Sequence, residues 1–295
     1  MVLPLILVFL ISFLLSRGVL FASERAGVVD MPDFRRKVNS YPIPKLGGIA
    51  FFIAFFSVLT PLASPSGINS ALLSALLCGG GMSLLFGAAD DFFDLPPTVK
   101  LLSQTAVASV SLLLLEGGRA PSPLPFVFIV FMMNAYNLLD GLDGLCASVS
   151  LSSLLFFALS DLVLFNTGVG YAAILLFFAL LGFLPYNAPP ARLYMGECGA
   201  ATLGLSISLF ALHAPTSAIL PQILFSFLPV CDTLYAFLRR SIAGRSPFSA
   251  DRGHLHHRLL DRGLSHCAAV NVLLLLSISV SLICFGLCLA LLPKN

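Results

Sequence analysis

Carboxylates, amides and histidines of this chain gather in a few short segments between long apolar stretches. Asp90 and Asp91 are adjacent, and a later segment carries Asn137, Asp140 and Asp143. Two neighbouring carboxylates repel each other when both are ionised, so a divalent cation or a shared proton is the usual way of holding them together. These segments predict metal or proton chemistry, and a solvated acidic loop is the alternative interpretation.

A third polar segment carries His254, His256 and His257, with Arg252 just before them. This spacing differs from the i, i+4 pair of a helical zinc site, and no water-activating Glu accompanies it. Hydrogen bonding to phosphate oxygens suits these side chains better. The chain also contains no Walker A sequence, no Gly-x-Ser-x-Gly elbow and no Cys-x-x-Cys pair, which excludes the commonest soluble chemistries.

Glu197 lies where a helix is expected to begin, and Lys45 follows a proline-rich segment that also contains a basic run. A carboxylate at a helix N-terminus is electrostatically favoured, which is a purely structural explanation for Glu197. Its grouping with the other acidic segments favours metal binding. The basic run fits either a phosphate ligand or a topology signal.

The elements that must position these residues are apolar helices. The chain has 295 residues, 58% of them hydrophobic and only 10% charged, with a mean hydropathy of +0.98. Stretches long enough to cross a bilayer recur along it, and we expect ten: 1–21, 47–62, 71–88, 101–115, 124–139, 145–164, 170–186, 200–213, 217–237 and 269–292. We therefore predict an all-α, polytopic integral membrane protein with a single transmembrane domain over residues 1–295.

The distribution of Lys and Arg residues indicates which loops lie on each side of the membrane. All but two of the 16 Lys and Arg residues fall at or beside the odd-to-even loops, and the exceptions are Arg119 and Lys294. The positive-inside rule makes these loops cytoplasmic and both termini periplasmic. Residues 1–7 lack Lys and Arg, which favours an uncleaved first helix over a signal peptide. A net charge of +2 and the lack of any nucleic-acid motif give no reason to expect a nucleic-acid partner.

Taken together, five ordered motifs resemble the polyprenyl-phosphate N-acetylhexosamine-1-phosphate transferases, the WecA, TagO and MraY group. The motifs are Asp30-x-Pro-x-x-Arg with Pro-Ile-Pro-Lys-Leu-Gly-Gly, Gly-Ala-Ala-Asp-Asp, Asn-Leu-Leu-Asp-Gly-Leu-Asp-Gly-Leu, Met-Gly-Glu-x-Gly and Asp-x-x-His-Leu-His-His. The histidine motif resembles the WecA and TagO branch more closely than the MraY branch, which carries three adjacent histidines.

This resemblance implies transfer of an N-acetylamino-sugar 1-phosphate from a UDP-sugar, UDP-GlcNAc or a related UDP-HexNAc, to undecaprenyl phosphate. UMP would be released and a lipid-linked cell-envelope glycan, such as lipopolysaccharide, O-antigen or cell-wall polymer, would be initiated. The implied cofactor is Mg²⁺, with Mn²⁺ as a substitute. The implied setting is the bacterial inner membrane, with the active site on cytoplasmic loops and a homodimer as one expected assembly.

The resemblance also assigns roles to individual residues. Catalytic roles fall to Asp90, Asp91 and Asp143, and metal binding to Asp90, Asp91 and Glu197. Substrate-binding roles fall to Lys45, Lys100, Asn137, Asp140, Arg252, His254, His256 and His257.

Three alternatives remain open from the sequence. Relatives usually carry Asp where this chain has Glu197, and Mg²⁺ demands near-octahedral geometry, so a catalytically impaired paralogue is one alternative. An MraY-type phospho-MurNAc-pentapeptide transferase is the second. A transporter is the third, but it would need polar groups near the bilayer midplane, whereas the carboxylates here gather at one face.

Overall fold

The computed structural model describes residues 2–31, 41–63, 67–215, 218–244 and 253–291, and most of them are helical. The only strands in this part of the chain, β1 (Val29–Asp30) and β2 (Ile43–Pro44), form a short antiparallel pair. The helices, with two π-helical turns η1 and η2, are α1 Val2–Ala26, α2 Gly47–Leu62, α3 Ser70–Ser74, η1 Ala75–Gly79, α4 Gly80–Phe93, α5 Pro97–Leu115, α6 Pro123–Leu139, α7 Leu145–Ser160, η2 Asp161–Phe165, α8 Val169–Asn187, α9 Gly196–His213, α10 Ile219–Leu224, α11 Phe227–Ile242, α12 Leu255–Asp261 and α13 His266–Leu291.

Six helical segments of the described chain are long and apolar enough to cross a membrane, and α2 and α6 are shorter apolar helices. The prediction of an all-α polytopic membrane protein is confirmed. Ten spans were expected, and the described residues hold six segments that meet these length and hydropathy requirements. The predicted span 217–237 is divided between α10 and α11 near Phe225, and α11 carries Asp232 and two arginines. The predicted span 200–213 forms most of α9, which is not among the six membrane-length apolar segments.

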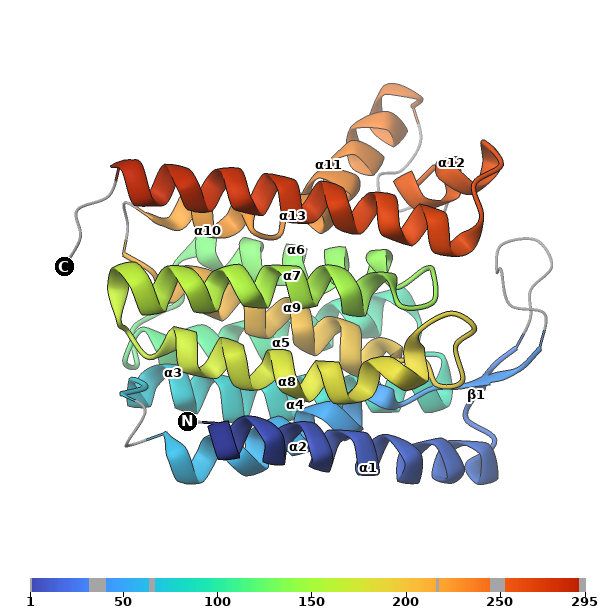
Figure 1. Cartoon of the computed structure of the whole chain (residues 1–295), viewed down its shortest axis with the longest axis horizontal. Helices are drawn as coiled ribbons and strands as arrows, with labels where there is room; N and C mark the ends of the chain where they lie inside the picture. The colour runs from blue at the N-terminus through green and yellow to red at the C-terminus, as the bar shows by residue number, and fades with distance from the viewer. Residues whose placement is uncertain (1, 32–40, 64–66, 216–217, 245–252, 292–295) are drawn as a thin grey trace.

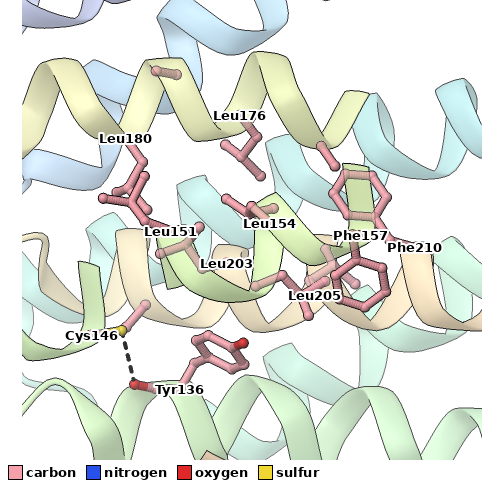
Figure 2. Packing of buried hydrophobic residues seen from close by; sticks show 14 of the residues in the cluster. Tyr136, Cys146, Leu151, Leu154, Phe157, Leu176, Leu180, Leu203, Leu205 and Phe210 are labelled. Carbon is pink, nitrogen blue, oxygen red and sulfur yellow. Dashed lines mark hydrogen bonds between the residues drawn. The ribbon is translucent and has the colours of Figure 1, made fainter. Parts of the chain in front are cut away.

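Helix α9 is the central element of the bundle. Nearly all of its residues are buried, and it packs against α4 and α6. Figure 2 shows its Leu203, Leu205 and Phe210 facing side chains of α7 and α8. Lipid is as apolar as leucine, so packing of this kind between membrane helices depends on close van der Waals contact.

Small residues allow this close approach. A methyl group added at Gly87 of α4 would collide with the backbone of Cys198, and one added at Gly48 of α2 would collide with the backbone of Gly199. Buried hydroxyl groups add interhelical hydrogen bonds, such as Thr202 Oγ1 to Ser83 Oγ at 2.8 Å. Both devices hold α4 and α9 together next to the acidic pair at the end of α4.

The polar segments lie at one end of the bundle. Figure 1 shows β1, the loop that follows α8, and α12 at the right-hand end, whereas α1 begins and α13 ends on the left. This arrangement agrees with the predicted grouping of the loops on one face and of both termini on the other. Residue Arg252, a predicted phosphate-binding residue, lies outside the described residues.

The close contact at Gly87 makes a prediction that can be tested within one helix. Gly87→Ala should destabilise the protein by about 1–3 kcal/mol, since the added methyl group has no space against α9. Gly81→Ala is the matched control, because nothing lies within 4 Å of a methyl group there, and alanine should stabilise the helix by up to ~1 kcal/mol. Thermal unfolding in detergent measures both variants, and equal melting temperatures would contradict the packing argument.

Candidate active site

A cavity of about 380 Å³ opens at the polar end of the bundle. Most of the predicted site residues line it, although they come from separate segments of the chain. These residues are Lys45, Asp90, Asp91, Lys100, Asn137, Asp140, Asp143, Glu197 and His257, and they are joined by Asp30, Asp94, Gly141, Leu142, Tyr194 and Gly196.

Loops from two distant parts of the chain are joined directly at this cavity. The Tyr194 amide donates to the Pro44 carbonyl at 2.8 Å, and the amides of Gly47 and Gly48 donate to the carbonyls of Tyr194 and Met195 at 2.9 Å each. Backbone pairing of this kind fixes the start of α2 against the start of α9. It brings Lys45 to the same cavity as Glu197.

Asp91 holds the beginning of α9. Its Oδ1 accepts a hydrogen bond from the Glu197 amide at 3.0 Å, and its Oδ2 accepts one from the Cys198 amide at 3.1 Å. The first N–H groups of a helix have no partner within the helix, and Met195 supplies no side-chain cap. Gly196 has a φ of 74°, and a side chain there would collide with the Asp91 carboxylate. Asp91 therefore has a clear positioning role beside any catalytic one.

Asp90 is paired with a cation. Its Oδ2 lies 2.6 Å from Lys100 Nζ, and its Oδ1 accepts a hydrogen bond from the Leu95 amide at 2.8 Å. The same Lys100 ammonium lies 3.9 Å from the Glu197 carboxylate. One lysine thus lies between two carboxylates that sequence reasoning assigned to a metal.

Asp143 supports the loop between α8 and α9. Its Oδ2 accepts from the Ala191 amide at 2.9 Å, and its Oδ1 accepts from the Tyr194 hydroxyl at 3.2 Å. Burial and the nearby Asp143 charge raise the pKa of the Tyr194 phenol, so this hydroxyl stays protonated and can donate. In this structure Asp143, predicted to be catalytic, shapes the wall of the cavity.

Asp140 differs from its neighbours, because its carboxylate has no hydrogen-bond or ion-pair partner within the described chain. Burial, and then the charges of Asp91 and Asp143, raise its pKa to about 8. Burial likewise raises the pKa of Glu197 to about 7. The cavity therefore holds more carboxylates than its lysines can neutralise, and some of them retain protons at neutral pH.

The three predicted histidines occupy different environments. His257 lines the cavity. His256 is buried, and its ring lies against Gly141, where a side chain would collide with it. Burial, followed by the adjacent His257, lowers the pKa of His256 to about 3, so this imidazole is neutral. His254 is buried away from the cavity against α11.

The donor set at the cavity fits a hard divalent cation in its chemistry. Carboxylates are the ligands that Mg²⁺ prefers, usually one or two from the protein with the rest from water and substrate phosphate. Among the described residues no three His, Cys, Asp or Glu side chains lie close enough to form a complete ligand cluster. Such an ion would take one or two of the cavity carboxylates Asp90, Asp140 and Glu197 and share its other positions with water and a phosphate ligand.

Sequence reasoning missed several contributors. Asp30 and Tyr194 line the cavity, and Asp232 and Arg240 contact His254. Asp232 and Arg240 fall within or beside a predicted membrane span. A carboxylate within a membrane span is costly, so the position of Asp232 inside the predicted span 217–237 was the available signal.

The sequence is similar to a known protein family and to several of its members. The sequence pattern of the family described as Glycosyl transferase family 4 matches residues 73–214. A probable undecaprenyl-phosphate N-acetylglucosaminyl 1-phosphate transferase of Bacillus subtilis is 33% identical, covering 88% of this chain and 76% of the relative. A decaprenyl-phosphate N-acetylglucosaminephosphotransferase of Mycolicibacterium smegmatis is 30% identical, covering 94% and 79%. A phospho-N-acetylmuramoyl-pentapeptide-transferase of Staphylococcus carnosus is 29% identical, covering 81% and 83%.

The raised pKa of Asp140 makes stability depend on pH. Folded Asp140 keeps its proton up to about pH 8, whereas the unfolded residue releases it near ~3.9. The folded state therefore binds the extra proton, and without divalent cations this group lowers stability progressively as pH rises through that window. Asp140→Asn should gain stability over the unchanged protein, with a difference that grows from acidic pH towards pH 8.

Thermal unfolding in detergent with a chelator, at about pH 5, 6.5 and 8, measures this difference. Glu24→Gln is the control, because Glu24 is exposed on α1 and does not line the cavity, so its replacement leaves the buried carboxylates unchanged. A constant difference between Asp140→Asn and the unchanged protein across the three pH values would contradict the assignment.

Proposed function

The chain belongs to the polyprenyl-phosphate N-acetylhexosamine-1-phosphate transferase family, and from this premise we propose that it transfers an N-acetylhexosamine 1-phosphate from a UDP-sugar to undecaprenyl phosphate. The observation that carries the proposal is the acidic cavity, where five separate segments bring carboxylates, two lysines and a histidine together. The two relatives with the higher identities are named for N-acetylglucosamine. UDP-N-acetylglucosamine is therefore the proposed donor.

The proposed reaction joins two anions. A phosphate oxygen of the lipid attacks the sugar-bearing phosphorus of the UDP-sugar, the bond from that phosphorus to the bridging oxygen breaks, and UMP leaves with that oxygen. The product is a lipid diphosphate sugar. A phosphate monoester has its second pKa near ~6 and is largely a dianion at neutral pH, so the attacking oxygen needs little help from a base. Positioning and charge neutralisation are the main requirements.

The residues of the cavity can meet these requirements. Lys100 is half-buried between Asp90 and Glu197, and Lys45 and His257 add cationic or hydrogen-bonding groups on the other walls. A bound Mg²⁺ would neutralise phosphate charge as the two substrates approach. One or two of Asp90, Asp140 and Glu197 are the proposed protein groups for that ion, and Asp91 keeps the start of α9 in place.

A membrane-borne acceptor can approach from the lipid side. Lys100 lies near the beginning of α5, next to Leu101 and Leu102, which are 50% and 68% exposed. On the neighbouring helix α4, Leu85 is 73% exposed. Apolar side chains beside a cavity cation suit a phosphate carried on a hydrocarbon chain. The soluble UDP-sugar would enter from the aqueous face, which we propose is the cytoplasmic side of the bacterial inner membrane.

The first test combines purified protein, Mg²⁺ and undecaprenyl phosphate with several UDP-amino-sugars and measures UMP. We expect UMP release with UDP-N-acetylglucosamine and its loss when a chelator removes the metal. Asp90→Asn should lower kcat by roughly a hundredfold or more, because it removes the charge that Lys100 pairs with. Glu24→Gln, which removes an exposed carboxylate of α1 outside the cavity, is the control and should retain activity.

Absence of UMP with every donor, while a purified relative is active in parallel, would refute the proposed function. Equal rates for Asp90→Asn and Glu24→Gln would refute the role of the acidic pair.

The presence of Glu197 leaves an impaired paralogue as the alternative, and a second prediction addresses it. Glu197 is nearly buried beside Lys100, so Glu197→Asp keeps the charge and shortens the side chain by one methylene. We expect Glu197→Asp to remain active and Glu197→Gln to lose about a hundredfold in kcat, since a needed charge is gone. Magnesium titrations of UMP release compare the variants. A gain of activity only in Glu197→Asp would identify the natural chain as impaired.

A further inference from the structure

Asp232 of α11 is a buried carboxylate outside the cavity, and both of its oxygens are engaged by the histidine segment. It is only 3% exposed. Its Oδ2 lies 2.7 Å from His254 Nδ1, and its Oδ1 accepts a hydrogen bond from the Leu255 amide at 2.8 Å. One carboxylate of α11 therefore holds two consecutive residues at the start of α12.

The hydrogen-bond pattern sets the tautomer of His254. A carboxylate can only accept, so the Nδ1 of His254 carries the proton. On the other side of the ring, Arg240 Nη2 lies 3.4 Å from Nε2, and a guanidinium can only donate. The neutral Nδ1–H tautomer satisfies both contacts, and the ring is fixed between an acid and a base of the same helix.

This fixed ring determines where the rest of the motif lies. His254 immediately precedes α12, and His257 two residues into that helix lines the cavity. His256, between them, packs its ring on Gly141 in the loop that carries Asp140 and Asp143. The placement of α12 against the cavity therefore depends on contacts made at both faces, one to α11 and one to the acidic loop.

We propose that Asp232 is a positioning residue, which through His254 and the Leu255 amide orients α12 so that His257 faces the phosphates of the substrates. The inference rests on the proposed function, since it assigns His257 a phosphate group to contact. Asp232 itself does not line the cavity.

A second buried carboxylate, Asp161, serves as a control that distinguishes a positioning role from a general contribution to stability. Asp161 is also 3% exposed and accepts from the Thr167 and Gly170 amides with its two oxygens. It lies at the far end of the α7 and η2 segment from the cavity. Asp161→Asn therefore reports the general cost of replacing a buried, backbone-bound carboxylate.

The experiment is a double-mutant cycle with Asp232→Asn, His257→Ala and the double variant, with Asp161→Asn as the control. Initial rates of UMP release give kcat and KM for UDP-N-acetylglucosamine. Asn can donate to Nδ1 and so favours the opposite tautomer, which faces Arg240 with a second donor. We expect Asp232→Asn to lower kcat/KM roughly tenfold to a hundredfold, as loss of a histidine-orienting carboxylate does elsewhere.

The cycle distinguishes positioning from destabilisation. In the His257→Ala background Asp232→Asn should cost at most about threefold, because the residue through which it acts is absent. Hydrogen exchange of the α12 amides should be faster in Asp232→Asn than in the unchanged protein and unaltered in Asp161→Asn. Losses that multiply in the double variant, or unaltered exchange of α12, would overturn the proposal.

His254→Gln provides a second route if Asp232→Asn does not yield folded protein. It removes the ring while leaving the Asp232 contact to the Leu255 amide, and its loss of kcat/KM should again disappear in the His257→Ala background. A multiplicative loss there overturns the proposal. An unchanged protein that releases no UMP would refute the proposed function instead, and hydrogen exchange would still show whether Asp232 holds α12.

Discussion

The Asp91 carboxylate accepts hydrogen bonds from the Glu197 and Cys198 amides in the first turn of α9, and the geometry of the cavity depends on this contact. It joins the end of α4 to the beginning of the central helix. Gly87, Gly48 and Gly196 permit the necessary approach, because a side chain at any of them would meet backbone or the carboxylate itself. The position of Glu197 relative to Asp90 and Lys100 follows from this junction.

The excess of negative over positive side chains in the cavity is the second constraint on the site. Carboxylates of the cavity outnumber its lysines, and burial raises the pKa of Asp140 and Glu197. A protein could remove this repulsion cheaply with apolar side chains, since buried charges contribute little to stability. A site that binds cations and phosphates has a reason to retain these carboxylates, because their repulsion is relieved only when the cations bind.

The acidic residues of the site divide into two groups by what they contact. Asp91 and Asp143 accept backbone or phenol hydrogen bonds and shape the cavity. Asp90 and Glu197 face Lys100, and Asp140 has no partner in the described chain. The histidines divide similarly, because His254 is held by Asp232 whereas His257 lines the cavity. Residues of one motif can therefore have different roles. The contacts of each side chain distinguish a residue that supports the site from one that is available to a ligand.

The sequence by itself determined the helical class, the approximate positions of the apolar helices and the grouping of polar segments at one end. Helix α2 has the predicted bounds, since hydropathy is a local property that a short window contains. The sequence overestimated the membrane spans where α10 and α11 meet, because a run of apolar residues does not reveal a break in a helix.

Only the tertiary structure decided which polar groups meet. Asp91 contacts residues more than a hundred positions away. Asp143 finds its partners beyond helices α7 and α8, and Asp232 finds His254 22 residues further along the chain. A hydrogen bond needs its two atoms at one distance and angle, and that geometry arises only when all the helices are packed.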